Sequence, residues 1–206
     1  MFVFAIDGPD GAGKTTAVKE VEGILETVFP DYEILTRRFP GQTEVGDVIR
    51  GMILSGSYNP DPLTEFLLFA ADDRETWVKT ITQYASEEKV IVLCDRSHIS
   101  SLVYQCARGV SSILMEQISD VRLDRIYDQI YVLQADRDVC AHRLKGRSKL
   151  NQTELPFWMK GIIADRWRSI KAHAPHEPIT LIDASSCDVA KNITQHIKGI
   201  IEGSTF

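Results

Sequence analysis

Residues 2–16 read FVFAIDGPDGAGKTT, a short apolar run followed at once by a glycine-rich loop. The apolar run has the length of a buried strand, and the loop from Gly8 to Thr15 fits the pattern G-x-x-x-x-G-K-[ST]. Such a loop turns backbone N–H groups toward phosphate oxygens, while Lys14 adds a mobile charge and the Thr15 hydroxyl is placed to ligate Mg²⁺. The stretch therefore predicts a strand, loop and helix that bind a nucleoside triphosphate. The expected contacts are Gly8, Gly11, Ala12, Gly13, Lys14, Thr15 and Thr16.

Length and charge limit the remaining possibilities. With 206 residues, 44% of them hydrophobic, the chain can bury one sizeable core, so we expect a single domain over residues 1–206. The formal net charge of −6 argues against a general nucleic-acid surface, and an anionic ligand must be held by a local cluster of Arg and Lys. Residues 1–4 are too short for a signal peptide, and no apolar run reaches the length of a membrane span.

The cysteines point to a reducing compartment. Cys94, Cys106, Cys140 and Cys187 are widely spaced and include no C-x-x-C pair. This spacing suits neither a zinc site nor a disulfide framework. We therefore expect reduced thiols and a cytoplasmic protein.

Short apolar runs alternate with longer segments of helical period, which is typical of a parallel sheet covered by helices. The expected strands are Phe2–Ile6, Tyr32–Thr36, Val90–Cys94, Gln129–Leu133 and Ile179–Ile182. The expected helices are Lys14–Val28, Thr43–Leu54, Leu63–Ser86, His98–Arg108, Arg137–Leu144, Glu154–Ala172 and Ala184–Ile201. The sequence predicts a three-layer α/β/α fold around a five-stranded parallel sheet.

One polar segment has no apolar period. Residues 145–153, KGRSKLNQT, lie between two expected helices. We interpret them as a mobile lid over the phosphates, with a solvated loop as the alternative.

In a parallel sheet of this kind, the residues that bind ligands lie at the carboxyl ends of the strands. Asp10 follows the first strand inside the anion-binding loop, where it is expected to accept a hydrogen bond from a sugar hydroxyl or from an arginine. Arg38 follows the second strand beside another arginine, which predicts a second phosphate site. Asp95 ends the third strand at a position suited to Mg²⁺, and Arg96 is expected to face both phosphate groups.

The residues after the second strand favour a phosphate over an alcohol as acceptor. A monophosphate oxygen is already anionic near neutral pH and needs no base, whereas a hydroxyl does. The basic pair at this position would offset repulsion between two anions, so positioning and charge neutralisation would supply the catalysis. A GTPase is disfavoured because the chain has no N-K-x-D run.

Together these motifs resemble the thymidylate kinase family. The matching elements, which span residues 2 to about 184, are Gly8–Thr16, Arg38 with Phe39-Pro40, Arg50, Leu67–Ala71, Asp95–Gln105 and Ile182–Ala184. The resemblance implies a phosphate-loop NTPase fold, ATP as donor, Mg²⁺ at Thr15 and Asp95, dTMP as acceptor, dTDP as product and a homodimer. We expect the dimer contact around Leu63 and Ser100.

The resemblance also assigns roles. It places the dTMP phosphate at Arg38, Arg50 and Arg96, the sugar near Asp10, and the base at Phe69, Ser101 and Gln105. The phosphate loop has Ala12 where some members have arginine. Members lacking that arginine supply the cation from the lid, so Arg147 joins Lys14, Asp10 and Arg96 as a catalytic candidate, with Arg143 at the ATP phosphates.

One departure concerns the base. The family arginine that reads thymine lies four residues after the stacking Phe, but Asp73 holds that place here and Arg74 comes one later. We expect a one-residue bulge between Phe69 and Arg74 that returns the arginine to the base and keeps dTMP as substrate. A regular helix would instead bring Asp73 to the base. The alternatives left open are a kinase for another deoxynucleoside monophosphate, a deoxynucleoside kinase and a nucleotide-binding regulator.

Overall fold

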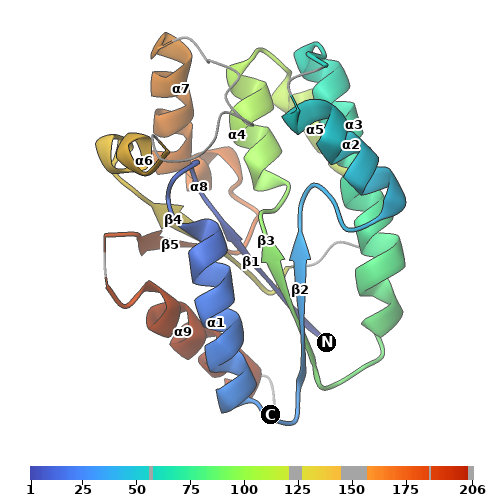
Figure 1. Ribbon diagram of the computed structural model, residues 1–206, viewed down its shortest axis with the longest axis vertical. Helices are drawn as coiled ribbons and strands as arrows, with labels where there is room; N and C mark the ends of the chain where they lie inside the picture. The colour runs from blue at the N-terminus through green and yellow to red at the C-terminus, as the bar shows by residue number, and fades with distance from the viewer. Residues whose placement is uncertain (56–57, 121–126, 145–156, 186, 204–206) are drawn as a thin grey trace.

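The computed structural model describes residues 1–55, 58–120, 127–144, 157–185 and 187–203. Within them five strands form one parallel sheet in the order β2-β3-β1-β4-β5 (Figure 1). The strands are β1 (Phe2–Asp7), β2 (Glu33–Arg38), β3 (Val90–Asp95), β4 (Gln129–Gln134) and β5 (Ile179–Asp183). Every expected strand is confirmed, with its ends displaced by no more than two residues.

The strands form because their apolar runs are continuous. All six residues of β3 are buried, as are five of the six in β1. Strands buried on both faces lose the alternation of polar and apolar residues, which is typical of a parallel sheet covered on both sides. In the register of the sheet, Phe4 lies beside Leu93 of β3 and Gln129 of β4. This register puts Asp95 at the same edge of the sheet as the start of the phosphate loop.

Helices cover both faces of this sheet (Figure 1). They are α1 (Lys14–Val28), α2 (Glu44–Leu54), α3 (Pro62–Thr76), α4 (Ile99–Ala107), α5 (Ser112–Asp120), α6 (Arg137–Leu144), α7 (Phe157–Arg168), α8 (Ile170–His173) and α9 (Val189–Gly203). None of the helices in the described ranges is long and apolar enough to span a membrane.

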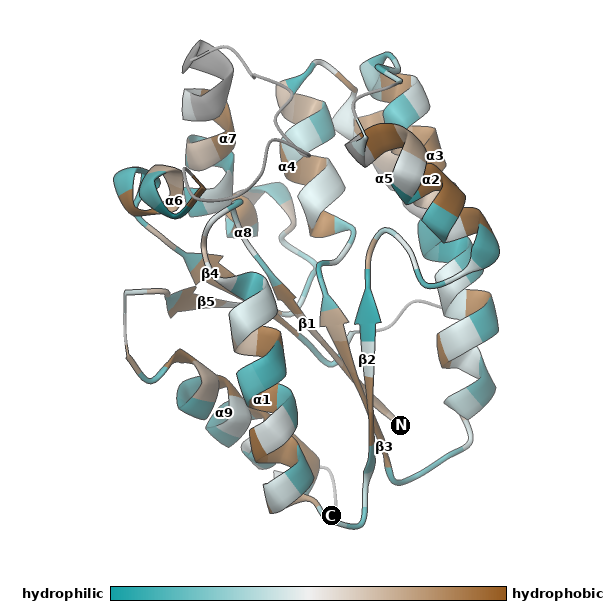
Figure 2. Ribbon diagram, in the orientation of Figure 1, coloured by the Kyte–Doolittle hydropathy of each residue, from teal (hydrophilic) through white to brown (hydrophobic). Residues whose placement is uncertain are grey.

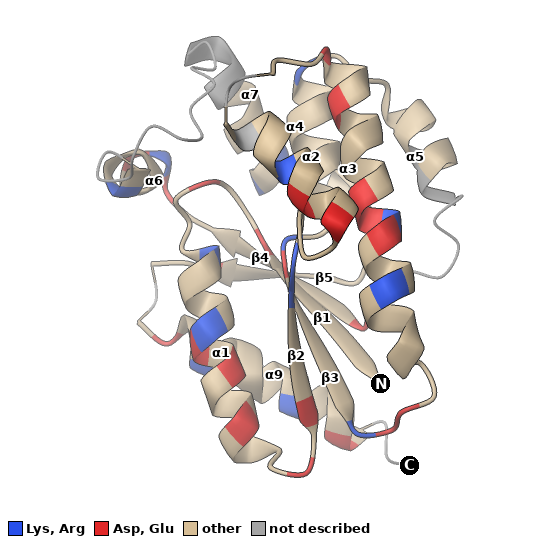
Figure 3. Cartoon of the chain, turned by 45° about the vertical axis from the view of Figure 1, so that its right-hand side comes forward, with Lys and Arg blue, Asp and Glu red and all other residues tan. Residues whose placement is uncertain are grey.

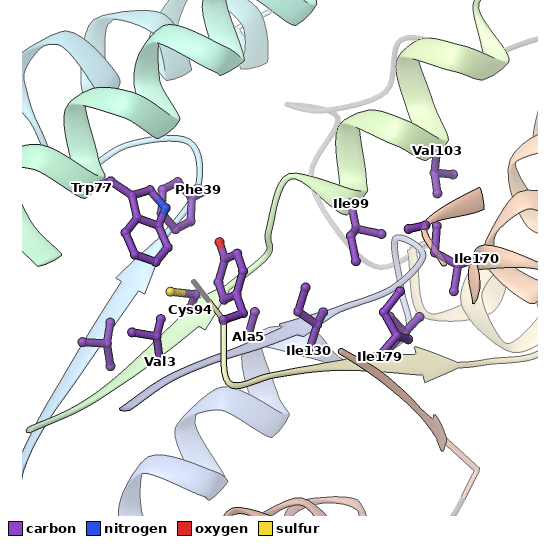
Figure 4. Packing of buried hydrophobic residues seen from close by; sticks show 14 of the residues in the cluster. Val3, Ala5, Phe39, Trp77, Cys94, Ile99, Val103, Ile130, Ile170 and Ile179 are labelled. Atoms are coloured by element: carbon purple, nitrogen blue, oxygen red, sulfur yellow. The ribbon is translucent and has the colours of Figure 1, made fainter. Parts of the chain in front are cut away.

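The core has one part on each face of the sheet. On one face, buried residues of α1 and α9 such as Leu25 and Ile197 pack against β1 and β4. On the other face, Trp167 of α7 packs on the same strands. Val103 of α4 and Ile170 of α8 also pack there (Figure 4). Figure 2 shows the apolar strands between the two helical layers, so the predicted three-layer architecture is confirmed.

Side chains define where α2 and α3 begin. The Thr43 hydroxyl accepts the Gly46 N–H at 2.9 Å, and the Asp61 carboxylate accepts the N–H groups of Leu63 and Thr64. Both side chains satisfy donors that the first turn of a helix leaves unpaired. Pro62 then fits the first turn of α3, where its missing N–H costs nothing.

Several helices differ from the sequence prediction. The helix expected over residues 63–86 is divided: α3 ends at Thr76, Trp77–Ile81 is π-helical, and Thr82–Tyr84 is a 3₁₀ turn. The helix expected over residues 154–172 is described from Phe157 and breaks at Ser169, between α7 and α8. The final helix begins at Val189 instead of Ala184, and α5 was not predicted.

The π-helical segment lies against the core. It adds one residue to a turn, with the Thr82 N–H donating to the Trp77 carbonyl, five residues back. Trp77 (Figure 4) and Ile81, at the two ends of the segment, are both buried in the core. The widened turn thus follows α3, which ends at Thr76.

Candidate active site

The phosphate loop is fixed by close packing at two glycines. Gly8 has φ +139°, and a Cβ there would lie 2.7 Å from the Leu133 carbonyl oxygen of β4. Gly11 has φ +86°, and its Cβ would lie 2.6 Å from the Cys140 carbonyl oxygen of α6. A larger residue at either site would displace the loop from β4 or from α6.

Lys14 lies at the centre of this loop. Its side chain is 7% exposed, and its Nζ donates to the carbonyl oxygens of Gly8 and Pro9, each at 2.9 Å. The Asp10 carboxylate lies 3.7 Å away. Burial lowers the pKa of Lys14 to about 8, helped by the charge of Arg96 and opposed by nearby carboxylates.

The two expected metal ligands are adjacent. The Thr15 hydroxyl at the start of α1 donates to Asp95 Oδ2 at the end of β3, over 3.0 Å. A hydroxyl and a carboxylate are the hard oxygen ligands that Mg²⁺ prefers. Within the described ranges no group of three or more His, Cys, Asp or Glu gathers as a fuller metal site.

Arg143 reaches the loop from α6. Its Nη1 donates to the carbonyl oxygens of Gly11 and Ala12, each at 3.3 Å. The structure thus places this arginine against the phosphate loop, and its role at the ATP phosphates stays a prediction. The other expected lid residues, Arg147 among them, lie outside the described residues.

Asp10 has the arginine partner that the sequence allowed. Its carboxylate forms an ion pair with Arg96, and its N–H donates to the Tyr104 hydroxyl at 3.3 Å. Although burial opposes ionisation, the charges of Arg96 and Lys14 lower the pKa of Asp10 to about 2. Burial also opposes the charge of Arg96, yet the carboxylates of Asp10 and Asp7 raise its pKa. The pair is ionised throughout the physiological range.

Three arginines come together from different elements. Arg38 ends β2, Arg50 lies within α2, and Arg96 follows β3. Burial lowers the pKa of Arg50, and the charges of Arg38 and Arg96 lower it further, which reflects their proximity. Figure 3 shows the basic end of β2 turned toward α2 and α3. Such a cluster of like charges is built to receive an anion.

The loop after β2 is held by α2 and α3. Asp72 of α3 is buried and accepts the Gly41 N–H at 3.0 Å, and Arg50 Nη1 donates to the Pro40 carbonyl at 3.0 Å. Burial raises the pKa of Asp72 to about 6 despite the Gly41 hydrogen bond, and the charge of Asp73 raises it further. These contacts fix the position from which Arg38 projects.

The register of α3 corrects our expectation about the base. The α-helix continues without interruption from Pro62 to Thr76, and the extra residue of the π-helical segment is accommodated from Trp77 onward. The expected bulge between Phe69 and Arg74 is therefore wrong. Asp73, one turn after Phe69, is buried, whereas Arg74 is exposed.

The two polar residues assigned to the base differ in their surroundings. Ser101 is half-buried on α4. Gln105 is buried, and its Nε2 donates to the Glu65 carboxylate of α3 at 2.8 Å. Glu65 also forms an ion pair with Arg108. Because Nε2 faces an acceptor, the amide orientation of Gln105 is fixed, with Oε1 as the remaining acceptor.

Sequence reasoning missed Asp7 and Tyr104. Asp7 extends β1 by one residue beyond the expected end and binds Ser97 and Ser100. An acidic residue directly before a glycine-rich loop is a signal that could have found it. The Ser100 hydroxyl hydrogen-bonds to Asp7 and Arg96 inside the site, and the dimer contact expected on the helices around Leu63 and Ser100 stays a prediction.

A parallel sheet of this strand order, with a phosphate loop after β1 and an arginine cluster opposite, defines a phosphate-loop kinase. The family model described as thymidylate kinase matches residues 6–157. A thymidylate kinase of Staphylococcus haemolyticus (strain JCSC1435) is 31% identical over 185 residues, covering 87% of both chains. Another, of Caldicellulosiruptor saccharolyticus, is 38% identical over 145 residues, covering 69% of both.

The fold agrees with this relationship. The crystal structure of thymidylate kinase from Ehrlichia chaffeensis superimposes with a TM-score of 0.72 at 23% identity, covering 98% of each chain. The chain belongs to the thymidylate kinase family, and it is a phosphotransferase.

Proposed function

We propose that this chain transfers the γ-phosphate of ATP to dTMP and yields ADP and dTDP. The observation that carries the proposal is the placement of the phosphate loop opposite the cluster of Arg38, Arg50 and Arg96. The phosphate loop suits a triphosphate, and the arginine cluster suits a monophosphate. Both lie at the carboxyl edge of the sheet. The family name of the relatives supports the choice of thymidylate as acceptor.

The residues present explain transfer between two anions. An oxygen of the acceptor phosphate forms a bond to the γ-phosphorus, while the bond from that phosphorus to the bridging oxygen of ADP breaks. The acceptor needs no base, because its second pKa is near 6. Lys14 balances charge on the donor, the arginine cluster balances charge on the acceptor, and Arg96 lies between the two sets.

A divalent cation fits this site. Thr15 and Asp95, whose oxygens lie 3.0 Å apart, would hold Mg²⁺ together with donor phosphate oxygens. Bound there, Mg²⁺ neutralises charge that develops on the transferred group and the leaving group. We propose that Arg143 assists at the donor phosphates and that Arg147 in a lid over residues 145–153 approaches them.

The acceptor base is proposed to lie between α3 and α4. Phe69 of α3 would stack on the base, while Ser101 and Gln105 of α4 would meet its polar edge. Because Asp73 lies on the same helix face as Phe69, Arg74 could contact the base only through the length of its side chain.

We further propose one kinase domain that acts as a cytoplasmic homodimer. The spacing of the cysteines supports a reducing compartment. Helices α2 and α3 pack against one another. The exposed apolar residues on these two helices support the dimer. These residues are Val45, Val48, Met52, Leu63 and Leu67.

A coupled assay of ADP release tests the reaction. We expect dTMP to give the highest kcat/KM in a panel of dTMP, dUMP, dCMP, dAMP, dGMP and thymidine. Arg38→Ala should raise the KM for dTMP far more than the KM for ATP, and Arg96→Ala should lower kcat as well. Turnover of thymidine equal to that of dTMP would favour a nucleoside kinase, and nucleotide binding without turnover would favour a regulator.

A further inference from the structure

Asp7, the last residue of β1, has a carboxylate with no exposed surface. A carboxylate removed from water is unfavourable unless hydrogen bonds or an opposite charge compensate it. Arg96 Nη1 lies 4.0 Å from Asp7 Oδ1, at the outer limit of an ion pair. The compensation must therefore come largely from hydrogen bonds.

Four hydrogen bonds reach this carboxylate from two segments. Oδ1 accepts from the Gly8 N–H and from the Ser100 hydroxyl, each at 2.8 Å. Oδ2 accepts from the Ser97 N–H and the Ser97 hydroxyl, each at 2.9 Å. Asp7 thus joins the first residue of the phosphate loop to the segment that follows β3.

Each segment carries a cation of the site. The Gly8 carbonyl accepts from Lys14 Nζ at 2.9 Å. The Ser100 hydroxyl accepts from Arg96 Nη1 at 3.1 Å. Asp7 is therefore separated from the side chains of Lys14 and Arg96 by one residue in each direction.

The backbone of Arg96 needs such support. Its φ is +80°, a conformation that residues other than glycine rarely adopt and that persists only where the surroundings enforce it. The Arg96 N–H donates to the Ile6 carbonyl at 3.0 Å, and the next N–H, of Ser97, donates to Asp7. The end of β1 therefore holds the backbone on both sides of Arg96.

We propose that Asp7 is a positioning residue that fixes the Arg96 guanidinium relative to Lys14 for phosphoryl transfer. The inference rests on the proposed function and adds a residue to it. Aspartate suits the role because a carboxylate is acceptor-only, whereas asparagine would turn an N–H₂ group toward groups that are themselves donors. The residue itself touches neither nucleotide.

Asp7→Asn tests the role at a temperature where the variant is folded. We expect kcat to fall by about 30-fold or more, and the KM for ATP and for dTMP to change less than about threefold, as for other residues that orient a catalytic group. Asp128→Asn is the matched control, since its carboxylate accepts the Val3 N–H at 2.7 Å at the opposite end of β1. An Asp7→Asn kcat near that of the control overturns the proposal.

Ser100→Ala tests the connection from Asp7 through Ser100 to Arg96. It can be measured whether or not Asp7→Asn folds. It should lower kcat by roughly threefold to tenfold alone and by much less when combined with Asp7→Asn, since linked residues are not additive. If Ser100→Ala lowers kcat by the same factor in the wild type and in Asp7→Asn, the two residues do not act together and the proposal is overturned. If Asp7→Asn does not fold, Ser100→Ala must still lower kcat without raising either KM, and an unchanged kcat overturns the proposal.

Amide hydrogen exchange separates this proposal from the proposed function. Asp7→Asn replaces one carboxylate oxygen with an NH₂ group, so exchange should accelerate at whichever of the Gly8 and Ser97 amides then faces that group, whereas Asp128→Asn should accelerate neither. Unchanged exchange at both amides overturns the positioning role even if the enzyme phosphorylates dTMP. Wild-type protein that phosphorylates no monophosphate refutes only the proposed function.

Discussion

Lys14 is under opposing electrostatic influences. Burial lowers its pKa to about 8, while carboxylates around it favour the charged form. Its ammonium donates hydrogen bonds to two carbonyl oxygens of the loop. These contacts keep a positive charge within the phosphate loop, and a triphosphate bound there would share negative charge between its β and γ oxygens.

We predict that Lys14→Met lowers kcat at least about 100-fold, the loss seen when one preorganised electrostatic contact is removed. Methionine has a similar length and tolerates burial, so the melting temperature should change little. Steady-state kinetics and thermal unfolding measure the two effects. Near wild-type turnover with an unchanged melting curve would remove Lys14 from catalysis.

Asp72 leads to a prediction about stability and pH. Its pKa is about 6 in the folded protein against an ordinary value of 3.8, so the folded state binds the proton more tightly. The stabilisation is full below pH 3.8 and is lost as the pH rises through 6. Asparagine keeps the acceptor for the Gly41 N–H but does not titrate.

The free energy of unfolding of Asp72→Asn, relative to wild type, should therefore rise by up to about 3 kcal/mol between pH 4 and pH 7 and level off above. Urea unfolding at four pH values measures the difference. A difference that does not vary with pH would mean that Asp72 has an ordinary pKa in the folded protein.

At the scale of elements, the strands were predictable because their apolar runs are unbroken, and the phosphate loop because its pattern is specific. The register of α3 was not predictable. Where a helix widens depends on how it packs against the rest of the fold, and helix propensity does not encode that tertiary effect. The position of Asp7 before the loop could have marked it as a candidate, but its partners could not be predicted, since Ser97 and Ser100 lie about ninety residues away in the chain.

The regular helix reverses our expectation for the base. With Asp73 on the face of Phe69, a base edge in this site would meet an acceptor, which suits an N–H or an exocyclic amino group better than the O4 atom of thymine. We predict that Asp73→Asn changes the ratio of kcat/KM between dTMP and dCMP, whereas Arg74→Ala leaves it unchanged. Both variants are measured on the same panel of monophosphates. A loss of dTMP preference in Arg74→Ala alone would restore the arginine as the reader of the base.

At the scale of the whole molecule, the sheet places the donor loop and the arginine cluster at one edge, and α2 and α3 continue outward from that edge (Figure 1). The same two helices position Arg38 through Asp72 and carry the exposed apolar residues. An interface on this surface would lie directly behind the acceptor site. Dimerisation would then affect the acceptor KM more than the donor KM.

The apolar surface of α2 and α3 gives the corresponding experiment. Val45, Val48 and Met52 recur at helical spacing, and Val48 is 62% exposed. We predict that Val48→Asp converts a dimer to a monomer in analytical ultracentrifugation, because a charge buried between two apolar surfaces is strongly unfavourable. Val28→Asp, at a 38% exposed position at the end of α1, is the matched control and should leave the dimer intact. Wild-type protein that sediments as a monomer would refute the dimer, and a dimeric Val48→Asp would place the interface elsewhere.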